Sequence, residues 1–299
     1  MARHHFVPQF YLKGWYGKRK TKLWAYTHDY HGNVISKLRS AKEICHSPDL
    51  YTVEADGLVS IEESSEEVER DFFGPIDNKA AVIYRKIKNK GIQKLTSEER
   101  RDWAKFIVSL NHRSPKSILS KIDGAANAVA SIIDKAKGEF LIDDDSEIGS
   151  LINNVDVNSA AKNGIIYAMT KIISEEKTID DICSKRWVVA DVDLSMGKFI
   201  SGDYPVVYGY NNKDKSYNYL ALSLGPSKLM IMLSPSVNSD RDAKNISLIY
   251  NEALVRQAEK FIISEEKLEN TKYIDFKKLL GIFLKKGGIV DPESGPLGQ

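Results

Sequence analysis

The spacing of the apolar residues changes along the chain, and this change constrains the fold more than any other feature. Between about residues 64 and 176 these residues recur at intervals of three and four, which predicts amphipathic helices. From Arg186 the sequence changes to runs rich in β-branched and aromatic residues, which are typical of strands. The runs cover residues 186–194, 198–210 and 228–235. We therefore expect a mainly helical α+β protein, with a helical core and a short antiparallel sheet from residues 186–235.

Proline and glycine residues indicate where the helices end. Gly74-Pro75 predicts a break in the first helix, and Pro115 predicts the end of the next one, because a proline disfavours helical geometry in the residue before it. Further helices are expected over residues 116–137, 147–153, 157–176 and 245–265, with a weaker one over 273–286.

The first sixty residues predict a small, irregular α/β module. Pro8 suits the first turn of a short helix that Gly14 would end. Strands are expected at residues 22–28, 34–38 and 50–55. We expect a single domain over residues 1–286, composed of the N-terminal module (1–60), the helical part (61–176) and the sheet with its helix (186–265). The Gly- and Pro-rich tail, residues 287–299, is expected to be disordered.

Composition excludes several classes of protein. Hydrophobic residues make up 42% of the chain, yet no apolar run approaches the ~20 residues that a membrane-spanning helix needs. The N-terminus also lacks the apolar stretch of a signal peptide, so we expect a cytoplasmic protein without a membrane partner. The two cysteines, Cys45 and Cys183, form no CxxC pattern and predict neither a disulfide framework nor a cysteine zinc site.

The N-terminal run RHHFVPQFYL holds the likeliest functional residues, His4 and His5. A histidine titrates near neutral pH and can act as an acid, a base or a metal ligand. The alternative is a solvated terminus, but the apolar VPQFYL that follows favours a packed segment. Residues 13–22 carry five basic residues and no acidic one, which indicates an anionic partner. Lys13, Lys18 and Arg19 are therefore candidate binding residues.

Three further regions offer candidates. Asp203 lies at a turn between two expected strands, where it would be a base or metal ligand, or simply bond its own backbone. Arg113, at a helix end, would clamp a phosphate or carboxylate, or stabilise the helix dipole. Asp77 is a tentative metal ligand, whereas Glu69 is expected on a solvated helical face. Asn251 on a late helix could contribute to a polar site.

The residues HHFVPQFYLKGW (4–15) resemble the opening of a widespread bacterial family of unknown function, whose members begin with an HHxVPxFYLxxF-type motif. The resemblance spans most of residues 3–264. It extends to LYTV at 50–53, NHRSP at 111–115, SGDYPV at 201–206, LSP at 233–235, and Asn251.

This resemblance implies positions for a site, but no activity. The positions are His4, His5, Pro8, Gln9, Arg113, Asp203 and Pro205. Asn111 or His112 stands near a position where the family usually has Gln. Gly202 is an extra residue between Ser201 and Asp203, and it leaves open which of those two side chains belongs to the site.

These candidates favour a metal-dependent nuclease that cleaves RNA or DNA as a bacterial toxin or an anti-phage effector. His4, His5, Asp203 and Arg113 would form its catalytic set. A divalent ion (Mg²⁺, Mn²⁺ or Zn²⁺) would be held by His5, Asp203 and, tentatively, Asp77. The alternative is a non-catalytic sensor or adaptor that binds a protein or a small anionic ligand. A third possibility is hydrolysis or transfer on a small phosphorylated metabolite. The sequence predicts no oligomeric state.

Overall fold

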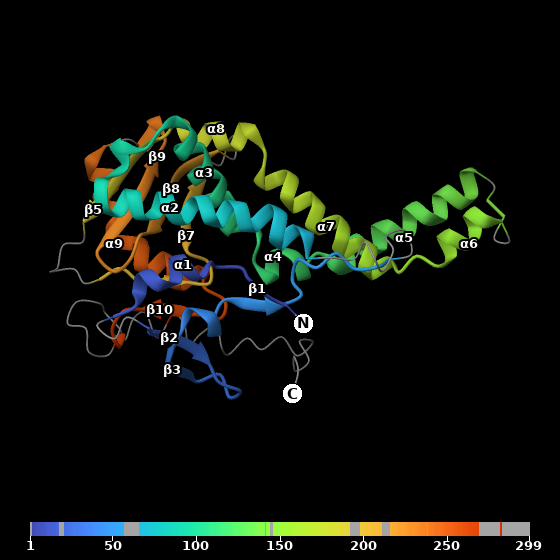
Figure 1. The fold of residues 1–299 in the computed structure, drawn as a ribbon, viewed down its shortest axis with the longest axis horizontal. Coiled ribbons are helices and arrows are strands. Elements are labelled where there is room, and N and C mark those ends of the chain that lie inside the picture. Colours follow the sequence, from blue (N-terminus) through green and yellow to red (C-terminus); the bar gives the residue numbers. More distant parts are fainter. Residues whose placement is uncertain are drawn as a thin grey trace. The chain divides into compact units, whose positions relative to one another are not determined.

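The computed structural model confirms the mainly helical α+β fold (Figure 1). It describes residues 2–17, 21–56, 66–140, 142–143, 146–191, 198–210, 216–237, 239–268 and Ile282. None of the helices in these residues is long and apolar enough to cross a membrane.

The chain divides into two compact units. The helical unit comprises Met1–Phe6, His46–Val82 and Glu98–Ile179. The sheet unit comprises Val7–Cys45, Ile83–Ser97 and Asp180–Gln299. The units therefore interleave along the sequence and do not follow the three consecutive segments that we expected. Whether they form one domain, as predicted, stays a prediction.

The helical unit contains most of the helices and one small sheet. Its strands β1 (Arg3–His5) and β4 (His46–Pro48) pair antiparallel. Its helices are α3 (Ser97–His112), α4 (Pro115–Leu119), α5 (Ile122–Glu139), α6 (Glu147–Asn153) and α7 (Val157–Ile173). Helices α2 (Gly74–Lys90) and α8 (Glu176–Ser184) begin in this unit and end in the sheet unit.

Side-chain caps begin several of these helices where the sequence places a small polar residue. The hydroxyl of Ser114 accepts the N–H of Ser117 at the start of α4, and the carboxylate of Asp156 accepts two N–H groups at the start of α7. As predicted, α3 ends before Pro115. The apolar face of α3 is fully buried at Trp103 and Phe106, so this helix lies in the core of the unit.

Gly74-Pro75 does not break the first helix, contrary to our expectation. Residues Val68–Phe73 form a π-helix, and its C-cap, Gly74, has helical dihedral angles (φ −54°, ψ −52°) from which α2 continues. The proline has no N–H to donate, and the wider π turn directly precedes it.

The sheet unit contains two four-stranded antiparallel sheets. One has the strand order β5 (Arg186–Asp191), β9 (Lys228–Leu233), β8 (Tyr217–Ser223) and β7 (Val206–Tyr210). The other has the order β3 (Val34–Arg39), β2 (Leu23–His28), β10 (Ile262–Ser264) and β6 (Ser201–Gly202). The short helix α1 (Gln9–Leu12) and the long helix α9 (Asp240–Gln257) belong to this unit.

The structure differs from the sequence-based expectations at several elements. Residues 50–55 form a turn and irregular backbone, not a strand. Helix α9 ends at Gln257, and strand β10 occupies residues that we expected to be helical. Helix α8 was not predicted. The expected helix over 273–286 and the tail 287–299 lie outside the described residues, apart from Ile282.

Candidate functional site

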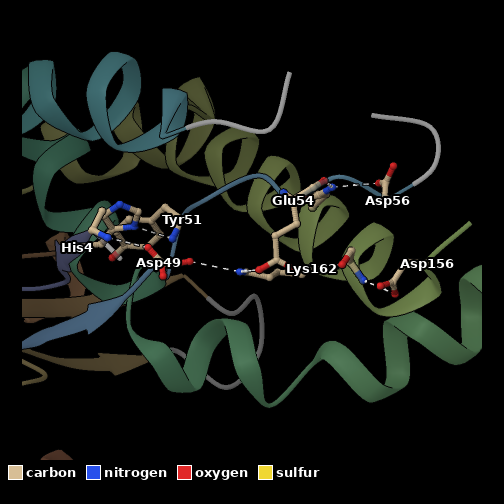
Figure 2. A network of polar contacts seen from close by, with 10 residues as sticks. His4, Asp49, Tyr51, Glu54, Asp56, Asp156 and Lys162 are labelled. Atoms are coloured by element: carbon tan, nitrogen blue, oxygen red, sulfur yellow. Dashed lines mark hydrogen bonds and ion pairs between the residues drawn. The ribbon is translucent and has the colours of Figure 1, made fainter. Parts of the chain in front are cut away.

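His4 is buried in the helical unit and does not project into solvent. Its side chain is only 1% exposed. Its Nδ1 accepts the backbone N–H of Tyr51 at 2.9 Å, and the two rings stack with centroids 5.4 Å apart (Figure 2). Burial lowers the pKa of His4, so the imidazole is neutral at pH 7. Because Nδ1 is an acceptor, the ring proton lies on Nε2.

His5 belongs to the same strand but contacts different residues. Its ring lies 5.4 Å from the ring of His46, its partner across the β1–β4 pair. Adjacent residues of a strand point to opposite faces. The two histidines therefore do not act on one group as a pair.

A polar network holds the irregular segment 49–56 against helix α7 (Figure 2). Lys162 of α7 donates to the backbone oxygen of Asp49 and forms an ion pair with Glu54. Asn163 donates to the backbone oxygen of Glu54 and to Asp56, and accepts the N–H of Glu54. Side chains of α7 thus bind backbone groups that would bind a neighbouring strand if this segment belonged to a sheet. This explains why the segment is not a strand.

Arg113 is fully buried, and its guanidinium lies close to two aromatic rings. Its guanidinium carbon lies 5.4 Å from the ring centre of Phe73 and 5.8 Å from that of Phe106. Nε donates to the backbone oxygen of Phe6 at 3.0 Å, and Nη1 donates to Asp77 at 2.9 Å. The hydroxyl of Tyr51 donates to the backbone oxygen of Arg113. Arg113 therefore joins α3, α2 and the chain that follows β1.

Two carboxyl groups share the electrostatic environment of Arg113. Burial, opposed by Arg113 and reinforced by the nearby Asp77 and Glu66, raises the pKa of Glu69 to about 7. Burial also raises the pKa of Asp77, against the influence of Arg113. Glu69 lies in the π-helix, and our expectation of a solvated face was wrong for it, because the residue is largely enclosed.

Several buried polar atoms of the helical unit have no hydrogen-bond partner among the described residues. They are Nε2 of His4, Oγ1 of Thr52, Oε2 of Glu69, Nδ2 of Asn111 and Nη2 of Arg113. Buried polar atoms are nearly always paired in proteins, so each such atom needs a physical explanation, for example a bound water, ion or ligand. Two of them belong to the motif residues His4 and Arg113.

Asp203 lies in the sheet unit, where its carboxylate binds backbone. Oδ1 accepts the N–H of Glu259 at 3.1 Å, and Oδ2 accepts those of Lys260 and Phe261 at 2.5 and 3.1 Å. These bonds favour the charged form, but complete burial outweighs them and raises the pKa of Asp203 to about 6. Asp203 holds the turn between α9 and β10.

The neighbouring Gly202 and Ser201 are also explained by packing. A Cβ on Gly202 would lie 2.8 Å from the backbone oxygen of Phe261, so the two strands can approach only at glycine. The hydroxyl of Ser201 is buried and hydrogen-bonds to that of Tyr11 at 3.1 Å. The sequence left open whether Ser201 or Asp203 belongs to the site. Both side chains have structural partners.

The remaining candidates fall in different parts of the chain. In the sheet unit, Gln9 begins α1, Lys13 is exposed, and Asn251 bonds both the N–H of Ile200 and the backbone oxygen of Lys198. Asn111 lies near the end of α3 in the helical unit. Lys18 and Arg19 lie outside the described residues.

The predicted site residues are thus distributed over both units. His4, His5, Asp77, Asn111 and Arg113 belong to the helical unit, and Asp203 belongs to the sheet unit. Within the described residues, no three His, Cys, Asp or Glu side chains are arranged to hold a metal ion. Sequence reasoning missed Tyr51 and undervalued Glu69. The LYTV motif contained the signal for Tyr51, but no pattern indicates the π turn that positions Glu69.

Comparison with known proteins identifies a family. Residues 3–267 match the family described as "Protein of unknown function (DUF4238)". This match covers nearly the whole chain and confirms the resemblance that the sequence motifs predicted. Searches of curated proteins and of solved structures gave no match.

Proposed function

Because the chain belongs to the DUF4238 family, whose function is unknown, we propose a function from the geometry alone. The helical unit binds the anionic group of a small ligand through Arg113 and its neighbours, as a sensor or adaptor module would. The single observation that carries this proposal is the set of buried polar atoms in the helical unit, those of His4 and Arg113 among them, that have no partner among the described residues.

The chemistry of these atoms favours an anion. Nη2 of Arg113, Nδ2 of Asn111 and Nε2 of His4 are hydrogen-bond donors. A guanidinium close to two aromatic rings is weakly hydrated and suited to bind phosphate or carboxylate. Glu69 is the one acidic group among the unpartnered atoms, and its raised pKa leaves it largely neutral below pH 7. Because Arg113 is fully enclosed, we expect slow binding that requires local opening.

Dimethyl phosphate, titrated by 31P NMR, tests this proposal because its charge stays constant between pH 6 and pH 8. We expect saturable binding that is several-fold tighter at pH 6, where Glu69 is mostly neutral, than at pH 8, where its carboxylate repels the anion. Glu69→Gln should remove this pH dependence while retaining binding.

Asn111→Ala should weaken binding about 5- to 10-fold, because one hydrogen bond to a charged ligand contributes roughly 1–1.5 kcal/mol. The matched control is Asn158→Ala, at an exposed position of α7 in the same unit, and it should leave affinity unchanged. The proposal fails if no saturable binding occurs at either pH. It also fails if both asparagine variants lose affinity equally.

A second candidate function, phosphodiester cleavage, is favoured by the pKa of Glu69. A carboxyl group with a pKa of about 7 beside a buried guanidinium has the properties of a general acid or base next to a phosphate-binding cation. The protein would then be a nuclease that acts as a toxin or as an anti-phage effector. Cleavage of RNA or DNA oligonucleotides with Mg²⁺, Mn²⁺ or Zn²⁺, lost in Glu69→Gln, would support this function. Absence of cleavage under all these conditions would exclude it.

The expected metal ligands do not fit an ion well. Both oxygens of Asp203 accept backbone N–H groups, and one oxygen of Asp77 accepts Nη1 of Arg113. We therefore derive no catalytic step through a metal. The divalent ion, a nucleic-acid partner and a cytoplasmic location stay predictions.

A further inference from the structure

Helix α5 of the helical unit presents an apolar and charged face that the described residues do not cover. The helix packs against α7, yet none of its eighteen residues is buried. Ile132 is 66% exposed and Phe140, just after the helix, is 74% exposed. Folded helices of this length normally bury one face, so this exposure needs an explanation.

The exposed residues form a regular seam. Lys121, Ala125, Ala128, Ile132, Lys135 and Glu139 follow one another at intervals of four, three, four, three and four. All of them are exposed except Ala125, which is partly buried. Alternating intervals of three and four place residues on the seam by which two helices pair in a coiled coil. The seam has small residues near its middle and opposite charges at its ends.

This seam is complementary to itself in the antiparallel direction. Rotation about a two-fold axis at residue 130 places Ile132 against Ala128 of the second copy, and Lys135 against Ala125. The same rotation places Lys121 against Glu139 of the second copy, once at each end. A large residue thus meets a small one, and each cation meets a carboxylate.

The glycines of α5 also support this pairing. Among the described residues, no atom would lie within 4 Å of a Cβ on Gly124 or on Gly138, so no neighbour in this part of the chain requires a glycine there. Glycine in a helix costs about 1 kcal/mol relative to alanine. Gly124 flanks the seam, and small residues there allow a second helix to approach closely.

From this spacing and charge complementarity we infer that the protein forms a two-fold dimer in which α5 pairs antiparallel with α5 of a second copy. The inference is independent of the proposed anion site, since neither Arg113 nor Glu69 takes part. In this dimer, α5 of the second copy covers the exposed face of α5.

Charge reversal tests this dimer by sedimentation velocity of the full chain. We expect a wild-type dimer at tens of micromolar protein, weakened at least tenfold by Lys121→Glu and likewise by Glu139→Lys, because each places like charges together. The double variant Lys121→Glu/Glu139→Lys should restore the wild-type dimer. The two positions are 18 residues apart, about 27 Å along the helix, so one chain cannot restore the pair alone.

Lys177→Glu, an exposed change of the same charge on α8, is the matched control and should leave the dimer intact. Circular dichroism of each variant shows whether it is folded. A wild-type chain that stays monomeric at 100 µM overturns the inference. Single variants that dimerise like the wild type, or a folded double variant that stays monomeric, overturn it as well.

Discussion

Arg113 connects three segments of the helical unit, and its removal should be among the most destabilising single changes. Arg113→Met preserves much of the apolar stem but leaves Asp77 without its cation and Phe6 without its donor. Removing one partner of a buried ion pair costs about 3–5 kcal/mol, and we expect a loss of this size in the free energy of unfolding. Urea denaturation followed by circular dichroism measures it.

Neutralising Asp77 separates this electrostatic loss from the loss of packing. The double variant Arg113→Met/Asp77→Asn should recover part of the stability, because the carboxylate of Asp77 is then no longer left without its cation. Lys79→Met is the control, since its ion pair with Asp102 is largely exposed and should contribute less than about 1 kcal/mol. A loss in Arg113→Met no larger than that in Lys79→Met would contradict the central role of Arg113.

His4 should make the stability of the protein depend on pH. Burial lowers its pKa in the folded state, so the unfolded chain takes up a proton first as the pH falls below the usual value of 6.5. The stability that neutral His4 contributes is therefore complete above this pH and decreases as the pH falls towards the lowered pKa. Protonation of Nδ1 would also break the bond from the N–H of Tyr51.

His4→Asn should flatten this dependence while retaining an acceptor for Tyr51. Urea denaturation at pH 7.5 and pH 5.5 should show a smaller difference for His4→Asn than for the wild type. At pH 7.5 the variant should lose about 1–3 kcal/mol, the effect of disturbing a buried hydrogen bond. His31→Asn, at an exposed position, should behave like the wild type. Equal pH dependence in His4→Asn and wild type would show that His4 does not titrate as its burial implies.

At the scale of single elements, Gly202 allows β6 and β10 to lie close together. In Gly202→Ala the new Cβ would approach the backbone oxygen of Phe261 to 2.8 Å and Cδ2 of Leu254 to 3.3 Å, so backbone must move. We expect a loss of about 1–3 kcal/mol in the free energy of unfolding. Gly164→Ala, on the exposed face of α7 with no atom within 4 Å, should instead gain about 0.5–1 kcal/mol. Two changes of the same sign would contradict this packing argument.

Local sequence predicted the elements that depend on neighbouring residues. The strands before and after the turn at residues 29–33 and the end of α3 at Pro115 follow from such signals. The strand β10 was missed because its pairing with β2 and β6 depends on residues sixty or more positions away. Likewise, the segment after Tyr51 resembles a strand in sequence, but Asn163 of α7 occupies its backbone groups.

The candidate site shows the same limit at the residue scale. The apolar residues after His4 indicated a packed N-terminal segment, but no sequence pattern indicated that Arg113 is fully buried. Sequence could not show that Asp203 binds the turn at residues 259–261, because nothing near Asp203 in the chain indicates that partner. Nor could it show the burial that shifts the pKa of Glu69, since that depends on how residues from several helices enclose it.

At the scale of the whole molecule, the path of the chain predicts cooperative unfolding. The chain passes between the units five times, after Phe6, Cys45, Val82, Ser97 and Ile179. Helices α2 and α8 each run through such a boundary without interruption. Neither unit is a continuous piece of chain, so we expect a single two-state transition in urea.

Arg113→Met, in the helical unit, and Gly202→Ala, in the sheet unit, report on this cooperativity. If the whole chain unfolds together, each substitution should lower the midpoint of the same transition, whether it is followed by circular dichroism or by tryptophan fluorescence. The fluorescence comes from Trp103 in the helical unit and from Trp15, Trp24 and Trp187 in the sheet unit, so both units contribute. If the units unfold separately, each substitution should shift only the transition of its own unit and leave the other midpoint at the wild-type urea concentration.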